Sequence, residues 1–144
     1  MGVESMGRVL TQATIENLQD VWDAERGTLP LKQVRRVTVT DALVNTGATL
    51  LSIPSKLIRQ LGLTKRHTKR VRNTTGTHEA QVYGTVRLTI GGRDCPTDVI
   101  EVPDETPVLI GQIPLEYLDY VVDPRSGQLI GNPEHGGEHM FESY

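Results

Sequence analysis

The sequence predicts an all-β domain, and three observations lead to this class. Residues 82–90 alternate apolar and polar side chains, as a half-buried strand does. The pair Gly91-Gly92 follows at once and supplies the positive φ angles of a tight hairpin turn. Residues 34–45 form a second stretch rich in β-branched side chains. Many short strands of this kind predict a β-barrel or a sandwich-like domain.

Length and composition exclude several classes of protein. A chain of 144 residues fits one compact domain. Its 15 Lys and Arg against 18 Asp and Glu argue against nucleic acid as the main partner. The single cysteine, Cys95, cannot form an internal disulfide. We find no apolar run long enough for a membrane span and no leader, and therefore expect a soluble, cytoplasmic protein without a membrane partner.

The N-terminal part predicts a helix over residues 12–26. Apolar side chains recur there at spacings of three and four, from Ile15 to Trp22. Gly27 ends this pattern. We therefore expect residues 1–30 to form a helical extension that precedes the β domain.

The middle of the chain alternates strands with short helices. After an apolar run at residues 50–53, Pro54 opens a short helix that ends before Gly62. Residues 93–102 are expected to pair with the strand at 82–90, and residues 106–110 form a further apolar strand.

The C-terminal part begins with a short helix around Pro114. A hairpin then pairs residues 120–122 with 128–130 across a turn rich in Pro, Ser and Gly. We place the main domain at residues 31–131 and expect a flexible tail over residues 132–144.

One segment carries the chemistry. Residues 42–49 read Ala-Leu-Val-Asn-Thr-Gly-Ala-Thr, which resembles the active-site signature of retropepsin-like aspartic proteases with Asn45 in place of the catalytic Asp. Residues 108–111, Val-Leu-Ile-Gly, resemble the second signature of that family, and residues 73–77 fit the tip of its flap. The resemblance covers about residues 30–131 and implies a retropepsin-like closed β-barrel with a flap hairpin and short helices, here with an added N-terminal helix.

The resemblance also implies a mechanism and a partner. Such an enzyme needs two carboxylates that share one proton, and this chain has one motif, so the second must come from another copy in a homodimer. The substrate is an extended peptide or protein, held β-fashion and cut between apolar side chains, and no cofactor or metal is implied. By resemblance, the catalytic positions are Asn45, Thr46 and Gly47, and the substrate-binding positions are Ala48, Thr49, Thr75, Gly76, Thr77 and Ile110.

Asn45 departs from the family pattern. Its amide has nearly the shape of a carboxylate but no titratable proton, so acid–base catalysis is lost. Either Asp→Asn has silenced an aspartic endopeptidase, or the chain is a natural pseudoprotease that binds peptides or dimerises without cutting. Because the rest of the motif is kept, we favour the first interpretation.

Two other patterns need an interpretation. Residues 135–139 match the His-x-x-Glu-His pattern of inverted zinc peptidases, but two consecutive glycines weaken the helix that this chemistry requires. Residues 65–72 are strongly basic, which predicts either a solvated flap arm or a preference for acidic substrates through Arg70 and Arg72.

Overall fold

The structure is a computed structural model that describes residues 8–140. Strands dominate these residues, as the sequence predicts. In chain order the elements are β1 (Val9–Asn17), α2 (Leu18–Glu25), η1 (Leu31–Gln33), β2 (Arg36–Val44), β3 (Leu51–Pro54), α3 (Ser55–Leu61), β4 (Thr64–Asn73), β5 (Gly76–Ile90), β6 (Arg93–Val102), β7 (Leu109–Ile110), α4 (Gln112–Leu118), β8 (Tyr120–Asp123), β9 (Gln128–Gly131) and η2 (Pro133–His135).

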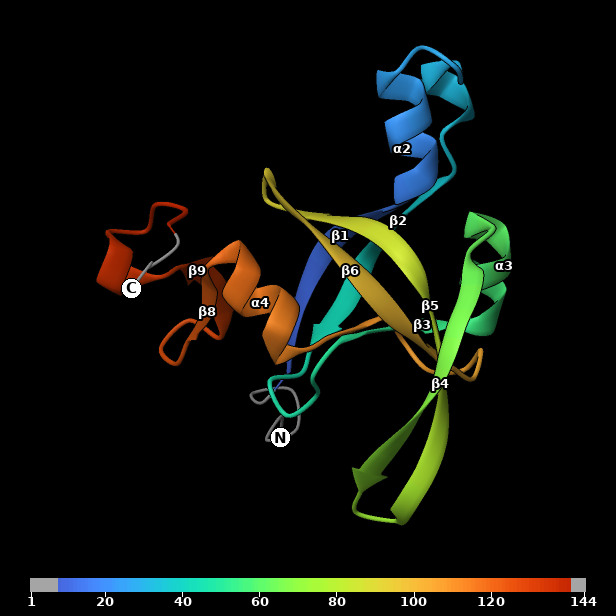
Figure 1. The fold of residues 1–144 in the computed structure, drawn as a ribbon. Helices are drawn as coiled ribbons and strands as arrows, with labels where there is room; N and C mark the ends of the chain where they lie inside the picture. Colours follow the sequence, from blue (N-terminus) through green and yellow to red (C-terminus); the bar gives the residue numbers. More distant parts are fainter. Residues whose placement is uncertain (1–7, 141–144) are drawn as a thin grey trace, which may run out of the picture.

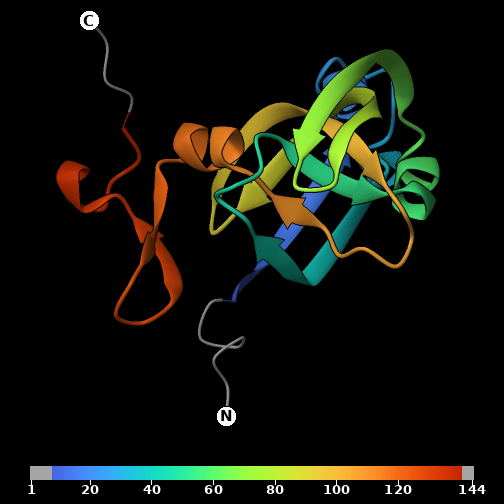
Figure 2. The same cartoon turned by 90° about the horizontal axis from the view of Figure 1, so that it is seen from below.

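Six strands form a ring of hydrogen-bonded neighbours (Figure 1). Their order is β1–β2–β7–β3–β6–β5, and β5 also pairs with β1, so the ring returns to its start. β4 pairs with the first half of β5 to form a hairpin that projects from the ring. β8 and β9 form a separate two-stranded sheet, which lies beside the ring in Figure 2. The mostly-β architecture is therefore confirmed.

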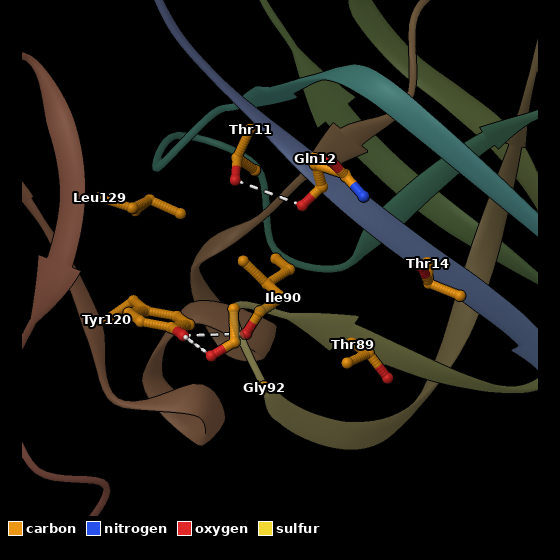
Figure 3. Close-up of a pocket in the computed structure, with 9 residues that line it drawn as sticks. Thr11, Gln12, Thr14, Thr89, Ile90, Gly92, Tyr120 and Leu129 are labelled. Carbon is orange, nitrogen blue, oxygen red and sulfur yellow. Dashed lines mark hydrogen bonds between the residues drawn. The ribbon is translucent and has the colours of Figure 1, made fainter.

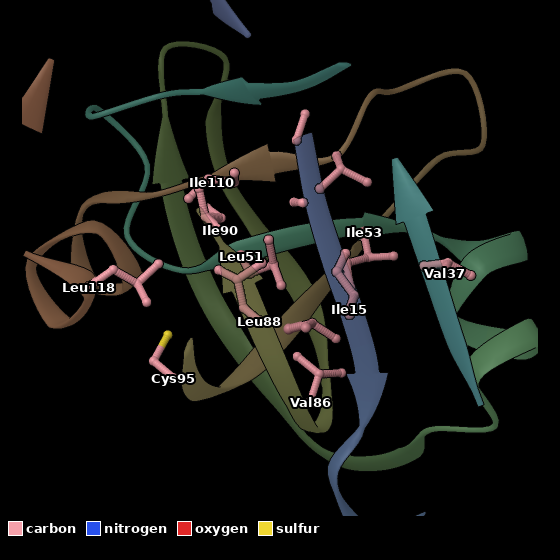
Figure 4. Close-up of a cluster of buried hydrophobic side chains, with 14 of the residues drawn as sticks. Ile15, Val37, Leu51, Ile53, Val86, Leu88, Ile90, Cys95, Ile110 and Leu118 are labelled. Atoms are coloured by element: carbon pink, nitrogen blue, oxygen red, sulfur yellow. The ribbon is translucent and has the colours of Figure 1, made fainter. Parts of the chain in front are cut away.

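The interior of the ring is an aliphatic core (Figure 4). Directly opposed residues share one face of a sheet, and one row of them crosses five strands. Every member of this row is buried: Val9, Val44, Ile110, Leu51 and Val99. Cys95 packs in the same cluster, and its burial, together with the nearby charge of Asp94, raises the pKa of its thiol to about 12.

The helix expected over residues 12–26 is wrong for its first half. Residues 9–17 are β1, and only Leu18–Glu25 are helical. The apolar spacing also fits a strand, since Ala13 and Ile15 both point into the core. β1 pairs with β2 on one side and β5 on the other. Local periodicity does not reveal the stabilisation that comes from such long-range pairing. Residues 9–17 thus belong to the ring and are not a separate extension. Trp22, which was expected on the apolar face of the helix, is 47% exposed.

Charged side chains hold β1 between its neighbours. Glu16 is buried and lies directly opposite Arg36 on β2 and Arg87 on β5. Its carboxylate pairs with both guanidinium groups, at 3.0 Å and 2.8 Å. Because a buried carboxylate needs such partners, this cluster favours the observed register of the three strands.

The start of α2 is fixed by Asn17 and Asp20. The Asn17 side chain accepts a hydrogen bond from the Asp20 N–H (3.0 Å) and donates one to the Leu61 carbonyl (2.9 Å). Asp20 in turn accepts hydrogen bonds from the backbone N–H and the guanidinium of Arg35. The Arg35 side-chain hydrogen bonds hold the pKa of Asp20 below its ordinary value, although burial acts in the opposite direction.

The helix predicted after Pro54 and the turn predicted at Gly91-Gly92 are both present in the structure. α3 ends at Gly62, whose φ of +64° is left-handed, and Gly91 and Gly92 form the turn between β5 and β6 at φ +56° and +82°. The strand expected over residues 106–110 is shorter and comprises only Leu109–Ile110. Pro107 has no N–H to donate, which limits pairing before this point.

The segment after β9 has more structure than the flexible tail expected from Asn132 onward. Residues 132–140 include η2 and gather around Asp119, which is buried at the end of α4. Its carboxylate lies 2.6 Å from His135 Nδ1 and accepts hydrogen bonds from Asn132 Nδ2 (3.2 Å) and the Met140 N–H (3.1 Å). A buried carboxylate requires such partners, so it orders this segment. The part of the expected tail at residues 141–144 and the first seven residues lie outside the described residues.

Among residues 8–140, none of the helices has the length and apolar character that a membrane span requires.

We expect Asp20→Asn to lower the free energy of unfolding by about 1–3 kcal/mol at neutral pH, because charged hydrogen bonds to Arg35 are lost. The lowered pKa of Asp20 means that its stabilising effect is complete above the ordinary value of about 4 and is lost as the pH falls through the folded value. The two proteins should therefore converge in stability at strongly acid pH. Urea denaturation from neutral to acid pH measures this, with Asp23→Asn on the same helix as the control. A constant difference across that range contradicts the prediction.

Candidate active site

The loop with the Asn-Thr-Gly motif joins β2 to β3 and is a hydrogen-bonded turn. The Asn45 N–H donates to the Ile110 carbonyl (2.9 Å), and the Ala48 N–H donates to the Asn45 carbonyl (3.0 Å). The Asn45 side-chain oxygen accepts a hydrogen bond from the Gly47 N–H (3.1 Å). Asn45, Thr46 and Gly47 are exposed at the tip of this turn. The backbone of the loop is thus fixed from within and from β7.

Gly111, directly after β7, packs against the other side of the same loop. Its N–H donates to the Leu50 carbonyl (3.0 Å), and the N–H of Gln112 donates to the Ala48 carbonyl (2.8 Å). A Cβ at position 111 would overlap the Leu50 carbonyl oxygen and lie 2.8 Å from that of Ala48. The φ of Gly111 is −86°, which any residue adopts. Glycine is therefore required here because of close packing and not because of backbone strain.

A cleft of about 760 Å³ opens beside the loop. The motif loop forms one side, the two arms of the β4–β5 hairpin form another, and the end of β6 closes it. Its lining is Asn45, Gly47, Ala48, Thr49, Leu50, Ser52, Val71, Arg72, His78, Glu79, Ala80, Ile100, Glu101, Val102 and Pro103. The volume suits a peptide-sized ligand, and apolar side chains provide much of the wall.

The floor of the cleft continues as a row on the outer face of the ring that is apolar except for the buried Ser52. This row lies one residue along each strand from the buried row, so its side chains point outward. Ser52 and Ile100 line the cleft, and Leu109, Leu43 and Leu10 follow in register across β7, β2 and β1. Leu10 is 54% exposed, and Leu43 and Leu109 are partly exposed. An apolar surface therefore runs from the cleft past the motif loop.

The structure brings several of the predicted site residues together. Asn45, Gly47, Ala48 and Thr49 all line the cleft, and Thr46 lies at the exposed tip of the same loop. The positions inferred from the motif thus form one continuous surface.

A hairpin of β4 and β5 lies where the flap is expected, but its tip does not line the cleft of the single chain. Thr75, Gly76 and Thr77 are exposed at the turn between β4 and β5, where the Thr75 hydroxyl lies 2.8 Å from His78 Nε2. The arms of the hairpin form the wall, through residues such as Val71 and Ala80.

The assignment of Ile110 to substrate binding is wrong. Its side chain is fully buried in the core row, and only its carbonyl reaches the site, as the acceptor for the Asn45 N–H. The neighbouring Leu109 faces outward instead, because successive side chains of a strand alternate between the two faces. Leu43 and Leu109, which face outward beside the cleft, were not predicted from the sequence as surface positions, and neither was Ile100, which lines the cleft. The signal was present, since the runs Ala42–Val44 and Val108–Ile110 are apolar on both faces.

The cleft contains both signs of charge. Arg72 and His78 come from the two arms of the hairpin, whereas Glu79 and Glu101 come from β5 and β6. Neither carboxylate belongs to the motif loop. A single chain therefore places one amide, and no carboxylate, at the position where the family signature has its acid.

The His-x-x-Glu-His segment has a structural role in the chain as described. His135 lies against the Asp119 carboxylate, and His139 Nε2 lies 3.0 Å from the Tyr117 carbonyl oxygen. η2 ends at His135, so the two histidines do not share one helical face. Among residues 8–140, no group of three or more His, Cys, Asp or Glu side chains is arranged to hold a metal ion.

A second cavity of about 540 Å³ lies between β1, the β5–β6 turn and the β8–β9 sheet (Figure 3). Tyr120 lies at one side of it, and its hydroxyl donates to the carbonyls of Ile90 (2.8 Å) and Gly91 (3.3 Å). Its lining includes hydroxyl and amide groups but no carboxylate, imidazole, amine or thiol. The cavity therefore offers no group for acid–base or nucleophilic chemistry apart from hydroxyls without a base.

A comparison with protein families identifies one matching family. The family model described as “gag-polyprotein putative aspartyl protease” matches residues 33–117, from before β2 to α4, which is more than half of the chain. The chain therefore belongs to this family of retroviral-type aspartyl proteases. A comparison with curated proteins gives no significant match. The family match excludes β1 and the β8–β9 sheet.

We expect Gly111→Ala to lower the free energy of unfolding by about 2–3 kcal/mol, because the added Cβ overlaps backbone atoms that cannot move independently. Gly47→Ala is the matched control, since its Cβ would meet only the end of the Asn45 side chain, at 3.3 Å. Chemical denaturation of both variants measures the difference. Equal losses would show that Gly111 does not support the loop by close packing.

Proposed function

We propose that this chain is one half of an aspartic endopeptidase, in which two copies meet about a two-fold axis with their Asn45 loops face to face. One observation carries the proposal: a single Asn-Thr-Gly loop, held by β7 and Gly111, presents position 45 at an exposed tip beside a peptide-sized cleft. Each chain supplies one such position, and the chemistry of the family requires two. A closed two-fold dimer supplies the second with no further motif.

Thr46 supports this arrangement. Its side chain is exposed and has no hydrogen-bond partner within residues 8–140. By resemblance to the family, its hydroxyl bonds to the corresponding loop of the second copy. The exposed tip is thus suited to a contact between two identical loops.

The lining of the cleft indicates the substrate. An extended peptide between the hairpin arms and the floor can pair its backbone with strand edges and place alternate side chains on the floor. The floor presents Ile100, and beyond Ser52 the same row continues with the apolar Leu109 and Leu43. We infer that the preferred peptides have apolar side chains at the bond to be cut.

Asn45 determines whether this chain can carry out acid–base catalysis. In an active pair, one carboxylate takes a proton from water while the other donates a hydrogen bond to the scissile carbonyl. The Asn45 amide can do neither acid nor base chemistry at ordinary pH. Its oxygen accepts a hydrogen bond from the Gly47 N–H, and a carboxylate oxygen can accept the same bond. Asn45→Asp therefore requires no change in the loop.

The intact cleft also favours a second candidate function. A natural pseudoprotease would keep the cleft and the Gly111 packing but have no acid at position 45, and this combination is what the chain contains. Such a protein would bind apolar peptides or dimerise without turnover. The coding sequence of the source organism distinguishes the two, because a natural gene for an active enzyme encodes Asp at position 45.

We expect Asn45→Asp to confer peptide cleavage, at least about 10²–10⁴-fold above the Asn45 chain, because a shared-proton pair of carboxylates is restored. Activity should be confined to acid and neutral pH, since one carboxylate must be protonated and its partner ionised. A library of fluorogenic peptides with apolar residues, with and without pepstatin, measures this.

Asn45→Ala is the control, since it removes the side chain without adding an acid. Sedimentation of the Asn45→Asp variant establishes whether it is dimeric under the assay conditions. A dimer that cleaves nothing across the library contradicts the proposal.

A further inference from the structure

We propose that β4, the outer arm of the hairpin, docks an acidic extended segment of a polypeptide. The contact uses cationic side chains on one face of β4 together with the open edge of this strand. Its meaning for catalysis rests on the proposed function, since the acidic segment would then belong to the substrate, outside the residues held in the cleft.

The charge on β4 is the first observation. This one strand holds a third of the 15 Lys and Arg of the chain and no acidic residue. All five side chains are exposed, and none forms an ion pair with any of residues 8–140. They are Lys65, Arg66, Lys69, Arg70 and Arg72. Unpaired charges of one sign attract a partner of the opposite sign.

The register of the hairpin gathers part of this charge on one face. Arg72, Arg70 and Lys65 lie opposite Thr77, Glu79 and Tyr83, which alternate along β5 and so share a face. The β-bulge between Lys65 and His67 gives Lys65 this orientation, because it shifts the register by one residue. We call Lys65, Arg70 and Arg72 the outer-arm cations.

A hollow beside the outer-arm cations could hold a carboxylate of the acidic segment. It has a volume of about 340 Å³ and is lined by Arg70, Val71, Arg72 and Thr77. Guanidinium groups present paired N–H donors that match the two oxygens of a carboxylate. The nearest acid on the same face, Glu79, lies opposite Arg70 but forms no ion pair with it among residues 8–140. The guanidinium groups are therefore available to a carboxylate of a partner.

The open edge of β4 favours a polypeptide over other anions. β4 lies at the end of the seven-stranded sheet and, among residues 8–140, pairs only with β5 (Figure 1). Alternate N–H and C=O groups along its ten residues therefore point away from β5. An extended peptide can add to such an edge as a further strand. β4 contains no Phe, Tyr or Trp on which bases of a nucleic acid could stack.

Charged residues on an edge strand also guard against unwanted pairing between chains. That role alone predicts no selective binding of an acidic peptide. The experiment below therefore asks for dependence on both the cations of this strand and the backbone of the ligand.

The test uses the whole Asn45 chain, so cleavage plays no part in it. The probe is a fluorescent peptide of alternating Glu and Val, and anisotropy gives its Kd at low and at physiological salt. We expect Lys65→Gln with Arg70→Gln to weaken binding at low salt at least about fivefold. This variant spares Arg72, the one outer-arm cation that also lines the cleft.

The matched control is Lys32→Gln with Arg125→Gln, which removes the same charge from two exposed residues that form no ion pair within residues 8–140. We expect the control to change Kd less than about twofold. Equal weakening in both variants overturns the proposal, since it would show a response to net charge alone.

Two further measurements test whether the peptide binds at the outer-arm cations and pairs with the edge of β4. A Lys-Val peptide should bind Lys65→Glu with Arg70→Glu more tightly than Lys32→Glu with Arg125→Glu, which has the same net charge. A Glu-Val peptide with alternate N-methyl amides keeps its charge but cannot pair with a strand edge, and should bind more weakly.

Unchanged binding of the methylated peptide, or tighter binding of a single-stranded oligonucleotide or of anionic vesicles than of the Glu-Val peptide, overturns the assignment to a polypeptide. These readouts are independent of the proposed function. If the Glu-Val peptide does not dock, cleavage by the Asn45→Asp variant can still be measured. If that variant cleaves nothing, docking to the Asn45 chain can still be measured.

Discussion

The pairing of β7 with both β2 and β3 is the interaction on which the position of the candidate site depends. β7 has only two residues, yet it runs parallel to β2 and antiparallel to β3, and its Ile110 carbonyl holds the Asn45 N–H. Gly111 then brings the next turn against the backbone of the motif loop without a side chain between them. A loop held on both sides in this way can present position 45 in one conformation, as a preorganised site requires.

The ring of strands extends beyond the segment that defines the family. β1 lies before the family match, but it lies between β2 and β5 and supplies Val9, Ala13 and Ile15 to the core. The carboxylate of Glu16 pairs with arginines on both neighbouring strands. At the other end, Asp119 gathers the segment that follows β9. Segments on both sides of the matched region are therefore integrated into the fold.

One hairpin carries both part of the cleft wall and a strand rich in cations. Val71 and Ala80 on the arms face a cleft whose floor continues into the apolar row of the ring. Of the outer-arm cations, Lys65 and Arg70 do not line the cleft, whereas Arg72 lines it, and all three lie on the strand with the open edge. Because the arms pair in register, the same alternation that builds the cleft wall also collects these cations. One β-hairpin can thus contribute both to the cleft and to a second contact.

The sequence by itself determined the Gly91-Gly92 turn, α3 and the mostly-β class, because each depends on local periodicity or on residues with special backbone freedom. The motif loop and the β4–β5 hairpin were expected from the family resemblance of residues 42–49 and 108–111. The resemblance also placed Asn45, Gly47, Ala48 and Thr49 at one site. Tertiary structure alone decided that residues 9–17 are a strand, since the gain comes from two partners distant in sequence. It likewise turned Ile110 inward and Leu109 outward, because the face of a strand is set by the register of its neighbours and not by the identity of the residue.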